Sequence, residues 1–298
     1  MVKKVKHAYL IIAHGQFDVL RNLVSLIDDE RNDIFIHFDK KVVNVPVINV
    51  TKSTLYLLTE RIDVRWGDYS QIQAELALFS FAKQCQVGKW YQYFHLISGQ
   101  DMPIKDQDYI HNFFDSHAGK EFIGFFQGDA ANELTKKVGC YHLFPKRFSK
   151  ERKINFHNLL RALFIRIQLL FGGVRNKDVE IVRGTNWVSI TNDFVEYILS
   201  HKGEIQRRFR YTFCADEVYK HTLCWNSEFK NRVYDITDEA RGCMRCINWI
   251  ISSEKSFLPS FTMADYDKLR NSEALFARKF DEENLDVVNR LHKQIESN

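Results

Sequence analysis

The chain has 298 residues, of which 45% are hydrophobic and 27% are charged, and this composition is typical of a folded globular protein rather than a disordered or fibrous one. The formal net charge of +4 does not argue for nucleic-acid binding, because the basic residues are scattered and no RNA- or DNA-binding motif is present. Since the chain has only 4 prolines and no Gly- or Ser-rich linker, we expect residues 1–298 to form a single domain.

Apolar runs and helical patterns alternate along the first part of the chain. We expect strands at 9–14, 34–38, 55–58, 93–98 and 121–125, and helices at 18–29, 68–83 and 106–114. Strands that alternate with helices in this way predict a mostly parallel sheet with helices on both faces.

Basic residues precede the first expected strand, as they do in a signal peptide. The apolar run at 8–13 is too short for such a signal, and no small-residue cleavage site follows it. No segment reaches transmembrane length without charges. We therefore expect a cytoplasmic protein with free thiols. Cys243 and Cys246 have CxxC spacing, but without a second ligand pair a zinc site is disfavoured.

A very apolar helix is expected at 155–171. Most helices of this kind are buried, so we expect burial. The basic residues Arg152, Lys153 and Arg175 beside it keep open the alternative of peripheral contact with a membrane surface. Farther along, strands are expected at 180–190, with a break at Arg183-Gly184, and at 245–250, and helices at 192–200, 216–225, 264–270 and 282–296.

Residues suited to a ligand site follow three of the expected strands. His14 follows the first, Asp39 the second, and Gly99 and Asp101 follow the strand at 93–98. In open α/β sheets, ligands bind beyond the carboxyl ends of the strands. Carboxylates and glycines are also common turn formers, so for Asp101 both a turn cap and a ligand contact remain open. No GxGxxG or GxxxxGK[ST] motif supports an ordinary dinucleotide or P-loop site.

Charged residues in the second half of the chain are the other candidates. Glu217 lies at the start of an expected helix and is either a helix-dipole carboxylate or a general base, because the neighbouring carboxylate of Asp216 can raise its pKa. Arg278 and Lys279 lie between two phenylalanines, which suits an anion such as a diphosphate, and Arg245 could join them. The alternative is ion pairing with the acidic residues that follow them.

Seven segments, in order along the chain, form a recognisable pattern: AYLIIAHG, DIFIHFDKK, VRWGDYSQIQAEL, YFHLISGQDMPIK, RGTNWVSI, CADEVYKHTL and ALFARKFD. In these segments the chain resembles the core-2/I-branching β-1,6-N-acetylglucosaminyltransferase and peptide O-xylosyltransferase family of inverting glycosyltransferases. The resemblance spans residues 7 to 281, and HFDKK, WG-x-x-S and FARKF are its most specific parts. It implies a bacterial member with a GT-A-like α/β fold of the Rossmann type.

The resemblance also implies roles for residues of this chain. Glu217 matches the catalytic base. The side chains of Arg278 and Lys279, with help from Arg245, would neutralise the donor diphosphate in place of a metal ion. The donor nucleoside and sugar would meet His14, Asp39, Trp66, Gly67, Ser70, Gly99 and Asp101, and the acceptor would meet Asn186 and Trp187. From the residues alone, packing is favoured over ligand stacking for Trp66.

The expected partners follow from the same resemblance. The donor is a UDP-sugar, either UDP-GlcNAc or alternatively UDP-xylose. The acceptor is a glycan, for which a lipid-linked form is one option. No metal ion or other cofactor is expected. The expected setting is surface polysaccharide synthesis in the cytoplasm or on the inner face of the membrane. The alternative from another class is a noncatalytic glycan- or nucleotide-binding protein on the same fold.

Overall fold

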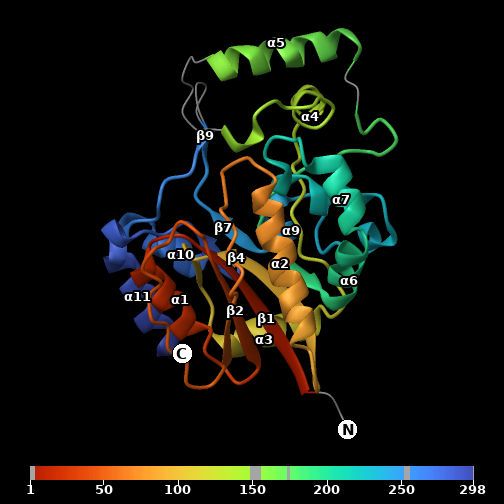
Figure 1. The fold of residues 1–298 in the computed structure, drawn as a ribbon. Coiled ribbons are helices and arrows are strands. Elements are labelled where there is room, and N and C mark those ends of the chain that lie inside the picture. The colour runs from red at the N-terminus through yellow and green to blue at the C-terminus, as the bar shows by residue number, and fades with distance from the viewer. Residues whose placement is uncertain (1–3, 148–155, 173–174, 252–255, 298) are drawn as a thin grey trace.

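A five-stranded sheet forms the centre of the computed structural model, which describes residues 4–147, 156–172, 175–251 and 256–297 (Figure 1). The strands follow the order β3-β2-β1-β4-β6. They are β1 (Lys4–Ala13), β2 (Asn32–Phe38), β3 (Thr54–Leu57), β4 (Lys89–Ser98) and β6 (Ser189–Thr191). The first four run parallel, and β6 is antiparallel to β4. The expected α/β architecture with a mostly parallel sheet is confirmed.

Strand β1 is buried on both faces. Tyr9 and Ile11 belong to one hydrophobic core, and Ala8 and Leu10 belong to the other. Successive side chains of a strand point to opposite faces, so a continuous apolar run marks a strand that is covered on both sides. This is why the apolar run at 9–14 correctly predicts a strand.

Helices cover both faces of the sheet, as expected. On one face lie α1 (Phe17–Leu26), α3 (Gln107–Ser116) and α11 (Leu285–Glu296). On the other face lie α2 (Ser70–Gln84), α6 (Asn192–Ser200) and α8 (Tyr219–Trp225). Figure 1 shows α1 and α11 on one side of the central strands and α2 and α6 on the other. The helices predicted at 18–29, 68–83, 106–114 and 192–200 are confirmed within a few residues at each end.

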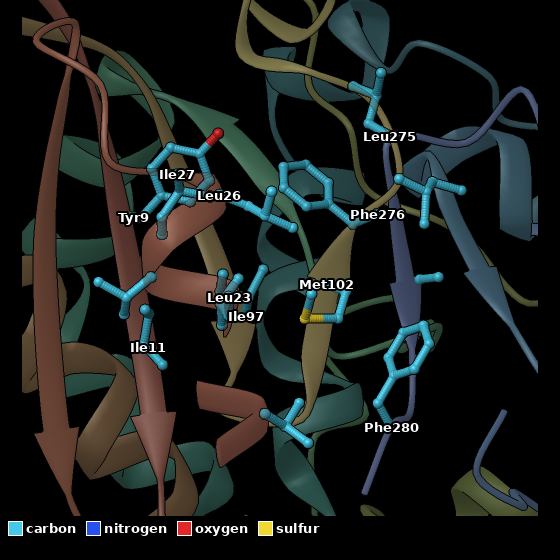
Figure 2. Packing of buried hydrophobic residues seen from close by; sticks show 14 of the residues in the cluster. Tyr9, Ile11, Leu23, Leu26, Ile27, Ile97, Met102, Leu275, Phe276 and Phe280 are labelled. Atoms are coloured by element: carbon cyan, nitrogen blue, oxygen red, sulfur yellow. The ribbon is translucent and has the colours of Figure 1, made fainter. Parts of the chain in front are cut away.

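A second sheet joins segments that lie far apart in the sequence. It consists of β5 (Asp101–Pro103), β10 (Phe276–Arg278) and β7 (Arg245–Ile247), in the order β5-β10-β7. Phe276 pairs with Pro103 on one side and with Arg245 on the other. Figure 2 shows Met102 and Phe276 among the buried hydrophobic residues that pack between this sheet and β1. The segment after β4 is therefore a short strand as well as a turn.

The predicted strand at 121–125 is wrong. Glu121, Phe122 and Phe125 each form one isolated bridge, to Val233, Ser189 and Gly184. Because successive residues pair with different segments, no ladder can extend. For the same reason the pattern at 180–190 yields only β6, and the strand expected at 245–250 ends at Ile247 before a break.

The remaining elements are short. The α-helices are α4 (Ala131–Lys137), α5 (Phe156–Leu170), α7 (Lys202–Phe209), α9 (Glu239–Cys243) and α10 (Tyr266–Asn271). Single 3-10 turns occupy Pro145–Arg147, Ala215–Glu217, Glu228–Arg232, Met263–Asp265 and Glu282–Asn284, and β8 (Ile250–Ile251) pairs with β9 (Ser256–Phe257). All six cysteines carry free thiols.

The expected burial of the apolar helix at 155–171 is wrong. Within α5 only Gln168 is buried, while Phe156, Leu159 and Leu170 keep 69%, 67% and 82% of their surface exposed. The helix lies at one end of the molecule, far from the central sheet (Figure 1). Residues 152, 153 and 155, which also entered that expectation, lie outside the described residues. Across the described ranges, no helix combines the length and the apolar character needed to cross a bilayer.

We predict that Gly184→Ala lowers the free energy of unfolding by about 3 kcal/mol or more, because overpacking a well-packed site is costly. A Cβ at residue 184 would stand 1.8 Å from the carbonyl oxygen of Gly124. Gly203→Ala is the matched control. A Cβ there meets no atom within 4 Å, and Gly203 lies in α7, so this variant should gain roughly 0.5–1 kcal/mol. Urea denaturation of both variants measures the difference, and equal stabilities would contradict the prediction.

Candidate active site

The carboxyl ends of β1, β2 and β4 meet at one edge of the sheet. The amide of Asp39, just after β2, donates to the carbonyl of Ala13 at 2.8 Å, and the amide of Gly99, just after β4, donates to that of Ile12 at 3.0 Å. The strand order reverses between β1 and β4, and in open α/β sheets ligands bind at such a point. His14 is exposed at the same edge.

Asp101 and Arg278 form a buried ion pair beside this edge. The Asp101 carboxylate accepts from the amide and the hydroxyl of Ser98 at 3.0 and 2.9 Å, and from Arg278 Nη1 at 3.0 Å. The Arg278 guanidinium lies 4.2 Å from the ring centre of Trp187. Burial lowers the pKa of Arg278, and the charge of Asp101 opposes that shift. Asp101 therefore caps a turn and also orients a cation.

Arg245 lies beneath this pair with only 1% of its surface exposed. Its Nη1 donates to the carbonyl of Cys243 at 2.7 Å and its Nη2 to the hydroxyl of Ser189 at 2.8 Å. Burial lowers the pKa of Arg245, while its Nε is buried without a hydrogen-bond partner. Arg245 thus adds positive charge near Arg278. Because Arg245 is buried, a ligand can reach it less easily than it can reach the partly exposed Arg278 and Lys279.

Glu217 ends the 3-10 turn Ala215–Glu217, and α8 begins two residues later, so the single helix expected at 216–225 is divided. Its side chain keeps 38% of its surface exposed and lies 3.9 Å from Lys137 Nζ. Burial raises the pKa of Glu217, and the charges of Lys137 and Arg183 oppose the rise. A carboxylate that reaches solvent and has a raised pKa is suited to remove a proton from a hydroxyl.

Asp216 supports Glu217 from the interior. Its Oδ2 accepts from Gln71 Nε2 at 2.8 Å, and its Oδ1 is buried without a partner. Burial first, and then the charge of Glu217, raise the pKa of Asp216 to about 7. The effect of one carboxylate on the other therefore runs opposite to the expectation: Glu217 raises the pKa of Asp216, whereas burial is the main cause of the raised pKa of Glu217.

The loop that precedes α2 is attached to the Glu217 turn. Gly67 has φ +73°, its amide donates to the side-chain carbonyl of Gln71, and its own carbonyl accepts from the amide of Cys214 at 3.0 Å. Trp66 is 39% exposed, and its ring meets the Phe213 ring edge-on at 5.2 Å. Trp66 therefore packs against Phe213 and stays partly exposed. The loop forms one wall of the site.

Residues 184–187 connect the carboxylate to the cations. The amide of Gly184 donates to the backbone carbonyl of Glu217 at 3.0 Å, and Asn186 Oδ1 accepts from Lys220 Nζ at 2.5 Å. Trp187, the next residue, lies against Arg278. One short segment thus fixes the distance between the candidate base and the candidate anion site.

Several predicted site residues have internal partners. A Cβ on Gly99 would lie 3.2 Å from that of Ala13, so this glycine allows two strand ends to pack closely. Ser70 is 5% exposed, and its hydroxyl accepts from the amide of Arg65 at 2.9 Å. Asp39 accepts from the amide of Lys41 at 2.8 Å and from its Nζ at 2.7 Å. Their roles toward a ligand stay predictions.

Sequence reasoning missed the charged residues around Glu217. Lys137 Nζ lies 2.6 Å from Glu133, and Arg183 Nη2 lies 3.3 Å from the same carboxylate. Burial would lower the pKa of Lys137, but the charges of Glu217 and Glu133 outweigh it and raise that pKa. For Lys137 the sequence signal was an i,i+4 Glu–Lys pair on α4, which is usually a solvated surface pair. Arg183 begins the segment RGTNWVSI, but its sequence position did not show that it lies near Glu217.

A metal ion was not expected. Among the described residues, no group of three or more His, Cys, Asp or Glu side chains is arranged to hold one. Two Asp-x-Asp triplets, at residues 106–108 and 265–267, have the spacing of a metal-binding motif, but their first carboxylates serve helix ends. Asp106 caps α3 by accepting from the amide of Tyr109 at 2.8 Å, and Asp265 takes part in the capping box of the turn before α10. Two hollows of about 290 and 140 Å³, at α10/α11 and α7/α8, are lined by none of the candidate site residues.

Comparisons with known proteins agree on one family. The sequence model described as "Core-2/I-Branching enzyme" matches residues 7–270. Xylosyltransferase 2 of Canis lupus familiaris is 22% identical over 93% of this chain and 32% of its own length. Xylosyltransferase sqv-6 of Caenorhabditis briggsae is 24% identical over 75% of this chain and 24% of its own. The chain thus spans at most about a third of these relatives.

Among solved structures, that of mouse xyloside xylosyltransferase 1 in its apo form aligns with 92% of this chain and 97% of the mouse chain, at 9% identity and a TM-score of 0.38. A similarity this distant assigns neither a fold family nor a function to this chain. The family model covers most of the chain, including the segments that carry Glu217, Gly184 and Trp187. The chain belongs to the Core-2/I-Branching enzyme family.

Proposed function

We propose that the chain is an inverting glycosyltransferase that moves a sugar from a UDP-sugar to a hydroxyl of a glycan acceptor. The observation that carries the proposal is the segment 184–187, which holds the Glu217 backbone at one end and contacts Arg278 at the other. Base and anion site are then fixed relative to each other, as a one-step displacement requires. Family membership supports the same reaction class.

In this proposal Glu217 removes the proton from the acceptor hydroxyl. The oxygen then attacks the anomeric carbon while the bond to the UDP oxygen breaks on the opposite face, so an α-linked donor gives a β-linked product. One base and stabilisation of the leaving group are enough, whereas a hydrolase needs two carboxylates that flank the bond. The raised pKa of Glu217 makes it a better proton acceptor.

The departing diphosphate gains negative charge, and in this proposal cations stabilise it without a metal ion. Arg278 is oriented by Asp101 and Trp187 before any ligand arrives, so little reorganisation is needed. Lys279 is its neighbour in the sequence, and Arg245 adds positive potential from behind.

The donor sugar is the finer question. UDP-GlcNAc is the donor proposed from the sequence resemblance, with a role in surface polysaccharide synthesis, a cytoplasmic or membrane-peripheral location and an acceptor that includes lipid-linked glycans. UDP-xylose is the second candidate, favoured because the similar curated proteins are xylosyltransferases. A noncatalytic binding protein would bind UDP without any transfer.

The decisive experiment measures UDP release from a panel of UDP-sugars with glycan acceptors, with and without EDTA. We expect one sugar to be preferred and EDTA to change the rate less than twofold. If the protein binds UDP but releases no UDP from any of the UDP-sugars, the result would contradict the proposal and favour a noncatalytic binding protein.

Glu217→Gln should reduce the transfer rate by about 10²–10⁴-fold, because general-base catalysis contributes that much. UDP affinity, measured by calorimetry, should stay within about threefold of the native value, since the base acts on the acceptor. Glu228→Gln, an exposed glutamate in another turn, is the control and should be fully active. Activity of Glu217→Gln within a few-fold of native would overturn the assignment of the base.

The pH profile of kcat/KM should fall on the acid side as Glu217 becomes protonated. Because burial raises this pKa, the fall should lie above the range of an ordinary glutamate. Lys137 opposes that rise, so Lys137→Met should move the acid limb to higher pH. Lys136→Met removes a neighbouring exposed cation and should leave the limb in place. An acid limb that does not move in Lys137→Met would contradict this electrostatic coupling.

Arg278→Met should lower kcat/KM by about 10²-fold, as loss of one preorganised donor to a developing anion does. It also leaves Asp101 buried without its cation, which lowers stability. The double variant Asp101→Asn/Arg278→Met should recover much of the stability but none of the activity. If the double variant also recovers activity, Arg278 has only a structural role.

A further inference from the structure

The apolar residues of α5 form a stripe along one side of the helix. Phe156, Leu159, Leu163, Ile167 and Leu170 follow one another at steps of three and four residues, the spacing of a single helical face. Each is at least 48% exposed. The described part of the chain therefore leaves this face, here called the α5 stripe, without a cover.

The opposite side of α5 attaches it to the protein. Gln168 is buried, accepts from the amide of Tyr141 at 2.8 Å and donates to the carbonyl of the same residue at 3.0 Å. The His157 ring meets the Phe144 ring edge-on at 5.0 Å and is hydrogen-bonded to Arg147. These contacts fix which side of α5 points outward. Figure 1 shows the helix at the end of the molecule, beyond α4.

The sequence that contains α5 is strongly basic. From residue 146 to residue 177 the sequence holds nine lysines and arginines and one carboxylate, a net charge of +8, whereas the whole chain carries +4. Arg166, three residues after Leu163 and four before Leu170, is exposed at the edge of the stripe. The helix itself contains no acidic residue.

We propose that the α5 stripe docks on the surface of an anionic phospholipid bilayer. Leucine, isoleucine and phenylalanine would enter the boundary between headgroups and acyl chains, while Arg166 and the neighbouring cations would remain at the level of the phosphates. A second copy of this chain fits less well, because two such faces would bring like charges together. The inference is independent of the proposed glycosyl transfer, since vesicle binding needs neither donor nor acceptor.

Vesicle flotation of the full chain tests the inference, with phosphatidylcholine alone and with phosphatidylglycerol added. We expect strong binding only to the anionic vesicles, and weaker binding at about 0.5 M salt than at about 0.1 M. Leu159→Ser/Leu163→Ser should weaken binding about tenfold or more, because it removes apolar surface from the boundary. Arg166→Glu should weaken binding by about 30-fold, because it changes the charge by two units and each unit near an anionic surface changes binding by about fivefold.

Val43→Ser/Val87→Ser is the matched control, because both valines are exposed apolar residues outside α5, at 88% and 84%. It should float as the native protein does. All variants should keep the native melting temperature, since exposed sites contribute little to stability. Three results would overturn the proposal: no binding of native protein to anionic vesicles, an equal loss in the control, or a dimer in light scattering that only the leucine variant dissociates.

Discussion

The ion pair between Asp101 and Arg278 is the constraint on which the arrangement of the site depends. It joins β5, directly after the central strand β4, to β10, which lies 177 residues later in the chain. Breaking such a buried pair on one side typically costs about 3–5 kcal/mol, because it leaves a charge without compensation. The pair therefore holds a guanidinium at the edge of the main sheet. The same edge collects the ends of β1 and β2.

The carboxylates near the site show two opposing effects. Burial raises the pKa of both Asp216 and Glu217, and the cations around them limit the rise. For Glu217 these cations are Lys137 of α4 and Arg183, the residue that precedes Gly184. Neighbouring charges thus set the pKa of Glu217, while the guanidinium of Arg278 provides positive charge at a separate position.

The position of α5 relates the site to the protein's surroundings. The helix is held by Tyr141, and the neighbouring His142 ring lies 6.2 Å from Phe213, which in turn contacts Trp66. A surface bound by α5 would therefore lie on the side of the molecule that carries the Trp66 wall of the candidate site.

The sequence by itself determined the architecture and most of the candidate residues. Strand β1 is apolar on both faces and α1 is strongly amphipathic, so local periodicity was enough for these elements, and seven sequence segments pointed to the family whose model matches residues 7–270. Only the tertiary structure decided that 121–125 is no strand, that α5 is exposed, and that Asp101 orients a cation. It also brought Lys137 to Glu217. The physical reason is that periodicity reports which side of a segment is apolar, whereas its partner is chosen by packing between residues far apart in the chain.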